Sequence, residues 1–269
     1  MAKGKVGLAL GGGAARCLAH IGVLEVLERA GISIDIIAGT SMGAIVGALY
    51  ANGRSASEIK ALAMEIAPKS LSFFADPVLP KTGLIRGRKI ENLLKSIIGD
   101  IEFRDLKMPF ACVATDVDSG EEVVMKDGSV WKAVRASGSI PVILSVPNWE
   151  GRYLVDGGLV NPVPVRLVQE MGADFIIAVS VAPFGSIRKA RAPNILEVIM
   201  QILNIASHQI VTYSLSGADI VIEPQVGNIG FLDFHRAREC ILQGELATQD
   251  LVSAIKKRYA KRYPNTLMA

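Results

Sequence analysis

A serine between a short apolar run and a helix-forming run is the feature that most limits how this 269-residue chain can fold. Ser41 is the middle residue of Gly39-Thr40-Ser41-Met42-Gly43, with apolar residues before it and a helix-forming run over 44–51 after it. This is the strand–turn–helix context of a nucleophile elbow, a turn too tight for side chains at its flanks. Such a turn holds the hydroxyl over a helix N-terminus, where free N–H groups and the helix dipole favour negative charge. We therefore predict a catalytic Ser41 flanked by two required glycines, Gly39 and Gly43.

Apolar and helix-forming segments alternate at the start of the chain. Residues 5–10 form an apolar run, and residues 15–30 carry apolar side chains at helical spacing before Gly31. The apolar run before Ser41 and the helix after it then repeat this order, which predicts a mainly parallel sheet with right-handed crossovers. Later strands are expected over 110–115, 121–125, 152–155, 175–181 and 219–222, and later helices over 131–138, 194–214 and 234–261.

Length and composition fit one large α/β domain. Half of the residues are hydrophobic, which allows a sizeable core and excludes extended disorder. No repeat or linker divides the sequence, so we expect a single domain over 1–269. The net charge of +3 gives no general electrostatic reason to expect nucleic acid as a partner. Two basic groups, at 188–191 and 256–262, are either solvated faces or a peripheral contact with anionic lipid headgroups.

Signals for targeting, metals and cofactors are weak. The three cysteines are widely spaced, odd in number and without metal-ligand spacing, as in a reduced cytosolic protein. The chain enters a strand within about five residues, so no signal peptide is expected. The apolar stretch over 195–215 contains too many polar residues for a membrane span. Asp116 and Asp118 lack the pattern of a calcium loop and fit a turn. We expect a cytoplasmic protein with no metal and no cofactor.

Residues 66–87 interrupt the alternation of strands and helices. Prolines and glycines are interleaved there with large apolar side chains. An apolar, proline-rich loop of this kind either packs over the core or forms a lid beside a hydrophobic substrate. The residues favour neither interpretation over the other.

The first glycine-rich turn is the candidate for binding an oxyanion. Gly11-Gly12-Gly13-Ala14-Ala15-Arg16 follows a buried strand and opens a helix, so its amides can converge on one point without obstruction by Cβ atoms. The same context suits a dinucleotide, but that fingerprint needs Gly-x-Gly-x-x-Gly and an acidic residue about twenty positions on. Arg16 or Cys17 stands at the last glycine position, and Asp35 begins a strand instead of ending one. An oxyanion hole is therefore favoured over a nucleotide site.

None of the three histidines occupies the place of a catalytic base. A Ser–Asp–His order needs a histidine after the acid. His20 lies in the first expected helix, His208 in an apolar helix, and His235 beside an aromatic residue, none of them on a glycine-flanked strand end. We interpret all three as structural.

Asp156 is the better candidate for the base. It follows the strand expected over 152–155 and precedes Gly157-Gly158, so it lies on a strand-end turn like that of Ser41. An aspartate before two glycines is often only a turn former. Its usual pKa of about 3.9 also makes it a weak base, unless partial burial raises that value.

Four segments together resemble the patatin-like phospholipase family, including its bacterial members related to neuropathy target esterase. They are the glycine loop over 11–16, the run Leu18-Ala19-His20-Ile21-Gly22-Val23-Leu24, the pentapeptide around Ser41, and Asp156-Gly157-Gly158. Residues 135–141 also look like the family's segment before the aspartate strand. The similarity covers about residues 5–182 in order and spacing, which implies a catalytic core there and a mostly helical extension over about 190–269.

The resemblance implies a three-layer α/β/α sandwich with a mainly parallel central sheet and a nucleophile elbow. It also implies a Ser–Asp dyad without histidine, in which Ser41 is the nucleophile and Asp156 the base. The oxyanion hole would be formed by Gly11, Gly12, Gly13 and Ala14, chiefly by Gly12 and Gly13. Arg16 matches a basic residue of the family and would either favour an anionic headgroup or brace the loop. Ala14 and Cys17 replace family glycines, so the loop is strained if either needs a positive φ.

The implied activity is hydrolysis of lipid or other acyl esters through an acyl-enzyme, of phospholipase A or lysophospholipase type and without a cofactor. Two other classes remain alternatives. An acyltransferase would share the elbow, and those related to the malonyl carrier-protein enzymes use a histidine base. A lipid-binding module without catalysis is the second alternative, because of the substitutions in the glycine loop.

Overall fold

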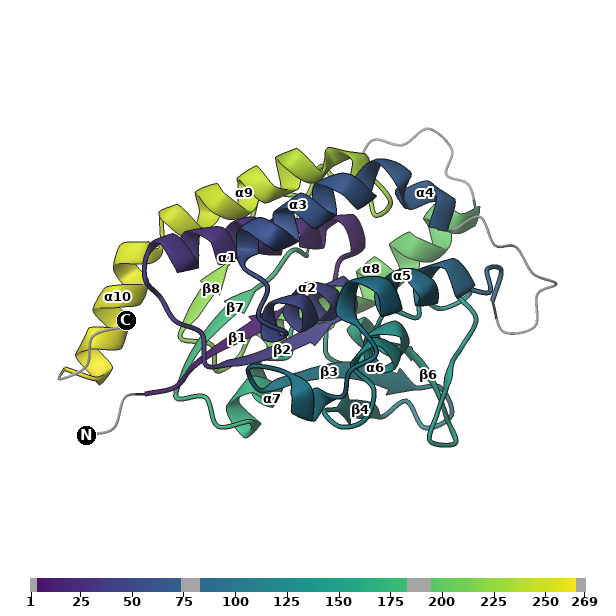
Figure 1. The fold of residues 1–269 in the computed structure, drawn as a ribbon, viewed down its shortest axis with the longest axis horizontal. Helices are drawn as coiled ribbons and strands as arrows, with labels where there is room; N and C mark the ends of the chain where they lie inside the picture. The colour runs from purple at the N-terminus through teal and green to yellow at the C-terminus, as the bar shows by residue number, and fades with distance from the viewer. Residues whose placement is uncertain (1–3, 74–82, 183–194, 265–269) are drawn as a thin grey trace.

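The computed structural model describes residues 4–73, 83–182 and 195–264, and a central mixed sheet organises them (Figure 1). Five of its strands run parallel in the order β3-β2-β1-β7-β8. The mainly parallel sheet predicted from the sequence is therefore confirmed. These strands are almost wholly buried because other elements cover both faces. Their bounds are Val6–Leu10 (β1), Ile36–Thr40 (β2), Phe110–Asp116 (β3), Phe175–Val179 (β7) and Ile220–Ile222 (β8).

Shorter strands join this sheet at β3 and run antiparallel. β4 (Glu122–Met125) pairs with residues 112–115 of β3, β6 (Arg152–Asp156) pairs with residues 114–116, and β5 (Asn148–Trp149) pairs with β6. β2 pairs with residues 110–113 of the same strand. Because β4 overlaps both β2 and β6 along β3, it occupies one edge, and β2 and β6 meet end to end on the other. The last residues of β2 and β6 are thereby neighbours.

Helices cover the two faces of the sheet (Figure 1). Alternate residues of a strand serve opposite faces, so Leu8 and Leu10 pack in one core cluster and Ala9 in another. This is the three-layer α/β/α arrangement implied by the resemblance. The first cluster is covered by α1 (Ala19–Arg29), α2 (Met42–Ala51), α3 (Ala56–Ile66) and α9 (Ala237–Gln249), and the second by α7 (Val165–Glu170) and the residues after α8 (Ile195–Ser214).

The C-terminal residues pack into the same core. The contact of α9 with α1 is close, since a Cβ on Gly22 would lie 2.0 Å from the carbonyl oxygen of Ile241. The prediction of one helix over 234–261 is wrong. A 3₁₀ turn, η5 (Phe234–Arg236), precedes α9, and a break at residues 250–251 separates α9 from α10 (Val252–Arg262). The break redirects α10, so that Tyr259 is buried and its hydroxyl donates to the carbonyl oxygen of Gly4 at 2.8 Å.

The segment that interrupts the alternation is described in part. A 3₁₀ turn, η2 (Ala67–Lys69), and α4 (Ser70–Phe73) continue from α3, and the chain is described again from Gly83. There the N–H groups of Leu84 and Ile85 donate to the carbonyls of Val142 and Ile143. α5 (Arg88–Ile98), a 3₁₀ turn η3 (Phe103–Asp105) and α6 (Val130–Ser137) follow. Residues 74–82 lie outside the described residues, so neither interpretation of 66–87, a lid or a loop packed over the core, is tested.

Candidate active site

Ser41 and Asp156 meet because of the register of β3. Thr40 at the end of β2 pairs with Val113, and Asp156 at the end of β6 pairs with the next residue, Ala114. The hydroxyl of Ser41 donates a hydrogen bond of 2.5 Å to Oδ2 of Asp156. The two candidate residues predicted from separate strand-end turns therefore contact each other, although 115 positions separate them in the sequence.

The turn around Ser41 has the strain expected of an elbow. Ser41 has φ +56° and ψ −125°, a conformation that costs a residue with a side chain about 1–3 kcal/mol. The two flanking glycines are required by close contacts. A Cβ on Gly39 would lie 2.6 Å from the Cα of Ala44, and one on Gly43 would lie 2.5 Å from the carbonyl oxygen of Gly11.

The end of α6 holds both members of the pair. The fully buried Ser137 accepts the N–H of Ser41 at 2.8 Å and donates to the carbonyl of Val113 at 2.6 Å. Two residues later, the carbonyl of Ser139 accepts the N–H of Asp156 at 2.9 Å. One turn of chain thus positions the Ser41 hydroxyl and the Asp156 carboxylate against the same strand.

Arg135 stabilises the segment over 137–139 by hydrogen bonds. It is 4% exposed, and it donates to the hydroxyl of Ser139 at 2.7 Å and to the carbonyl of Ser145 at 3.2 Å. The hydroxyl of Ser139 in turn donates to the carbonyl of Arg135 at 2.9 Å. Burial lowers the pKa of Arg135, and the nearby Glu91 carboxylate raises it. The guanidinium therefore braces the segment that carries Ser137 and Ser139.

Asp156 has the protonation behaviour that a base requires. The pKa of its carboxyl is raised to about 6. Burial is the main cause, and it outweighs the hydrogen bonds from the Ser41 hydroxyl and the Gly158 N–H, which act to lower the pKa. The bond from Gly158 N–H to Oδ1 measures 2.8 Å, which leaves Oδ2 for Ser41. Gly157 has no room for a side chain, because a Cβ there would lie 2.3 Å from the carbonyl of Val113. At neutral pH the carboxylate is ionised but more basic than an exposed one.

The glycine loop lies directly above Ser41. A Cβ on Gly12 would lie 3.3 Å from the Cβ of Ser41. The structure corrects which amides face the site. Gly11 N–H donates to the carbonyl of Val179 and Gly12 N–H to that of Pro162, so neither is free to bind an oxyanion as predicted. These bonds anchor the start of the loop to β7 and to the turn before α7.

Three other amides, on the glycine loop or directly after Ser41, have no acceptor in the part of the chain that the structure describes. They belong to Gly13, Ala14 and Met42. The first two follow the anchored glycines, and the third begins α2 directly after Ser41. A helix N-terminus leaves its first N–H groups unpaired, and these groups favour negative charge. Met42 was not predicted from the sequence, although the rule that the residue after the nucleophile donates would have indicated it.

The two substitutions in the glycine loop differ in their effect. Ala14 has φ +49°, so the strain anticipated from the sequence is present at this position. Cys17 does not have a positive φ, and its thiol donates to the carbonyl of Gly11 at 3.3 Å. Arg16 is 7% exposed, and its Nε donates to the carbonyl of Ile229 at 2.8 Å. This contact favours the bracing role of Arg16 over contact with a headgroup.

The histidines lie apart from the Ser41–Asp156 pair where they are described. His20 is buried, its Nε2 lies 2.8 Å from the carbonyl of Gly11, and burial lowers its pKa to about 4. It is therefore neutral at pH 7 and holds the glycine loop. His235 is exposed on η5. His208 lies within α8, and its side chain is outside the described residues.

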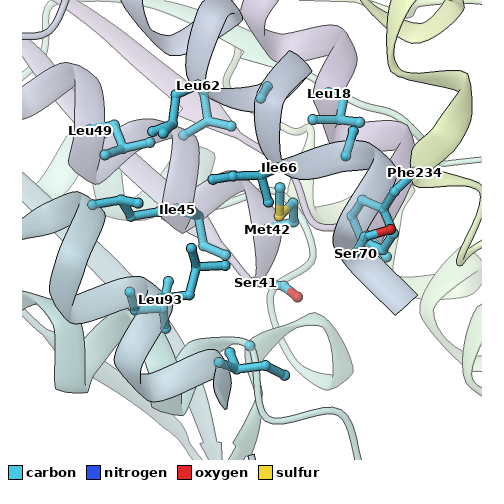
Figure 2. Close-up of a pocket in the computed structure, with 18 of the residues that line it drawn as sticks. Leu18, Ser41, Met42, Ile45, Leu49, Leu62, Ile66, Ser70, Leu93 and Phe234 are labelled. Carbon is cyan, nitrogen blue, oxygen red and sulfur yellow. The ribbon is translucent and has the colours of Figure 1, made fainter. Parts of the chain in front are cut away.

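An apolar cavity opens at Ser41 (Figure 2). Its volume is about 170 Å³, and Ser41 and Ser70 are the only polar side chains among the described residues that line it. The rest of the lining comes mainly from α2, α3 and α5, with Phe234 of η5 on another side. The Ser41 hydroxyl thus lies between the Asp156 carboxylate and an apolar space.

Comparison with known proteins decides the family. A family model for patatin-like phospholipases matches residues 8–168, which include Ser41, Asp156 and the glycine loop. The chain belongs to the patatin-like phospholipase family. This patatin-like chain is 40% identical over 184 residues to human patatin-like phospholipase domain-containing protein 6, a match that covers 65% of the chain and 13% of that protein.

This patatin-like chain also has bacterial relatives. It is 38% identical over 176 residues to an uncharacterized NTE family protein of Mycobacterium tuberculosis, covering 65% of the chain and 49% of that protein. The chain therefore matches less than half of the length of either relative. The crystal structure of VipD from Legionella pneumophila shares its fold, with a TM-score of 0.55 and 14% identity over 94% of this chain and 67% of that one.

The described residues show neither a cluster of metal ligands nor a helix that could span a membrane. Within them, no three His, Cys, Asp or Glu side chains gather as metal ligands would. Asp116 accepts the N–H groups of Asp118 and Ser119 and pairs with Arg152 at 2.5 Å, as a turn former does. None of the described helices combines the length and the apolar character needed to cross a bilayer.

Proposed function

We propose that this protein is a serine lipid acyl hydrolase, of phospholipase A or lysophospholipase type, that cleaves carboxylic esters through a Ser–Asp dyad. The observation that carries the proposal is the 2.5 Å hydrogen bond between Ser41 and Asp156, placed where unpaired amides and an apolar cavity meet. Each group that acyl transfer needs is then within reach of one hydroxyl: a base, donors for the oxyanion, and space for an acyl chain.

In the acylation half, the Ser41 oxygen attacks the ester carbonyl while Asp156 accepts the hydroxyl proton. The carbonyl oxygen becomes an oxyanion, which the N–H groups of Gly13, Ala14 and Met42 would bind. Collapse of this intermediate breaks the bond to the leaving alcohol, and Asp156 returns the proton to that alcohol. The products are a free alcohol or lysolipid and an acyl ester on Ser41.

In the deacylation half, a water molecule takes the place of the alcohol. Asp156 accepts one of its protons as its oxygen attacks the acyl-enzyme carbonyl, and the same amides bind the second oxyanion. Collapse then breaks the bond to Ser41, which regains its proton from Asp156. The fatty acid releases the second proton of the water to solvent and leaves as its carboxylate, and the dyad returns to its starting state.

A carboxylate can act as base here because of its surroundings. Its pKa of about 6 brings it closer to neutral pH than an exposed aspartate, which raises its proton affinity without protonating it at pH 7. The hydroxyl proton is already directed at Oδ2. Stabilisation of the oxyanion lowers the barrier further, since one hydrogen-bond donor to the oxyanion typically increases the rate by about 10²–10³.

The test is a screen of lipid classes and p-nitrophenyl esters with the wild type and Ser41→Ala. We expect ester hydrolysis by the wild type and a loss of about 10³-fold or more in the variant. A fluorophosphonate probe should label the wild type and not the variant. Ser216→Ala, at an exposed position after α8, is the matched control. Equal turnover by Ser41→Ala would refute the dyad, and a folded wild type that neither labels nor hydrolyses would favour a lipid-binding module.

A further inference from the structure

Three helices direct the same pattern of apolar side chains at one space. On α2, α3 and α5 the lining residues stand at positions i, i+3, i+4 and i+7, starting at Met42, Ile59 and Ile90 respectively. This spacing places four side chains on one face of each helix. Three such faces normally close on one another, yet here they enclose an open volume of about 170 Å³. That exceeds an engineered cavity of about 150 Å³ that is known to bind benzene.

The long axis of the cavity follows the helices that line it. α2 and α3 are joined by a short turn, and Figure 2 shows Leu49 near Leu62 at one side and Met42 near Ile66 at the other. The Nδ2 of Asn52, just after α2, donates to the carbonyl of Ile98 at 3.1 Å, so the ends of α2 and α5 lie together. The cavity therefore extends along α2, away from Ser41.

Buried core side chains stand at the far end of the cavity. Leu49 is 3% exposed and Ile59 is 2% exposed, while Ile97, at the same end of α5, is partly exposed. From Met42 to Leu49 the helix rises by about 10 Å. The space is thus a channel that begins at Ser41 and ends against the buried Leu49 and Ile59.

We propose that this channel holds the acyl chain of the substrate and that Ile45 and Leu49 set the preferred chain length. The proposal rests on the proposed function, because the chain bound there is the one esterified to Ser41 during turnover. None of the described residues that line it carries a charge, so the channel would exclude a headgroup and accept an unbranched aliphatic chain. The leaving alcohol must then lie on the other side of Ser41, toward Asp156.

Chain length should change the specificity constant until the channel is full. Burial of one methylene favours binding by a factor of about four. From butyrate to octanoate, kcat/KM should therefore rise by about 10² in the wild type. Beyond the closed end no further gain is expected, because additional methylenes would have to stay outside or displace Leu49.

The experiment measures kcat/KM for p-nitrophenyl acetate, butyrate, octanoate and dodecanoate. In Ile45→Phe, a larger side chain half-way along the channel should lower the dodecanoate-to-acetate ratio by about tenfold or more. Leu49→Ala should move the optimum to longer chains. Ile101→Phe is the matched control, since Ile101 is equally half-buried but lies outside the channel, and it should leave the ratio unchanged. Thermal unfolding of each variant monitors folding.

A second measurement separates this proposal from the catalytic one. Binding of a fluorescent long-chain fatty acid to Ser41→Ala is compared with its binding to the double variant that also carries Ile45→Phe, where we expect an affinity at least tenfold lower. If the wild type hydrolyses no ester but binds the fatty acid in this Ile45-dependent way, the proposed function fails and the channel stands. If Ile45→Phe and Leu49→Ala change neither the ester ratio nor fatty acid binding, the channel is refuted.

Discussion

The two sides of Ser41 are constructed in opposite ways. On the side of β3, β6 and α6, hydrogen bonds fix the pair: Asp156 accepts from the Ser41 hydroxyl, Ser137 accepts from the Ser41 N–H, and Ser139 accepts from the N–H of Asp156. On the side of α2, α3 and α5, apolar faces meet without filling the space between them. Directional hydrogen bonds therefore define the positions of the atoms on the first side, whereas the cavity on the second side has room for acyl chains of different length.

This contrast separates chemistry from selection of the substrate. Hydrogen bonds hold Ser41, the proposed nucleophile, in a strained turn, so a change there should slow all substrates to a similar extent. Apolar contacts are non-directional, so a change in the channel should alter the relative rates of different substrates. The ratio of dodecanoate to acetate turnover is therefore the quantity that distinguishes the two sides.

The largest effect is expected for Asp156→Asn. An amide cannot accept the Ser41 proton, so kcat/KM should fall by about 10²–10⁴ for both esters with their ratio unchanged. In the wild type, kcat/KM should fall tenfold per pH unit below about pH 6, since protonation of Asp156 removes the base. A change in the ester ratio, or a wild-type profile without this acid limb, would break the assignment of Asp156 to the chemical side.

The same variant has a consequence for stability. The pKa of Asp156 is raised on folding, so the folded chain binds a proton more tightly than the unfolded chain between about pH 4 and pH 6. Stability from this group is therefore present at low pH and is lost as pH rises through that window. Asp156→Asn should raise the free energy of unfolding by about 1–3 kcal/mol at pH 8 and not near pH 4. Urea denaturation at both values measures the difference.

The polar side could be predicted from the sequence only in part. Ser41 and Asp156 were identifiable because each ends a strand and is followed by a glycine turn or a helix. Ser137 was not, because its role depends on the position of the end of α6 relative to β3. The predicted set of amides included the free ones of Gly13 and Ala14 but also those of Gly11 and Gly12, since nothing local shows that these two donate to Val179 and Pro162.

The apolar side was predicted less completely. Of the three helices that line the channel, only the one directly after Ser41 was predicted from the sequence, and α3 and α5 were missed although apolar residues recur at helical spacing from Ile59 and from Ile90. Whether three apolar faces close or leave a cavity depends on distances between helices, which the pattern does not contain. The break before α10 was missed for a similar reason, because neither glycine nor proline marks it and its cause is the packing of Tyr259.

A smaller loss of activity is expected for Ser137→Ala. The variant leaves the N–H of Ser41 and the carbonyl of Val113 without their buried partner, which should cost about 1–3 kcal/mol of stability. The elbow would relax, so kcat should fall by about 10–10² for both esters while KM changes little. Steady-state kinetics and the rate of fluorophosphonate labelling measure this effect.

Thr248→Val is the control for Ser137. It removes another fully buried hydroxyl, which donates to the carbonyl of Gly244 within α9, away from the site. It should destabilise the fold to a similar extent and leave kcat unchanged. If both variants lose activity in proportion to stability, Ser137 has only a structural role and the contrast between the two sides weakens.

The smallest effect is expected at Ala14, the residue that belongs to both sides. Its N–H is one of the free amides, and its side chain lines the cavity. With φ +49° it bears a strain of about 1–2 kcal/mol that glycine would not. Glycine also loosens the unfolded chain by about 0.4–1 kcal/mol. Ala14→Gly should therefore raise the free energy of unfolding by less than about 1.5 kcal/mol, measured by urea denaturation. If the strain at Ala14 directs its N–H toward the oxyanion, kcat for acetate should fall in the stabilised variant. An unchanged kcat would show that the N–H of residue 14 reaches the oxyanion without that strain.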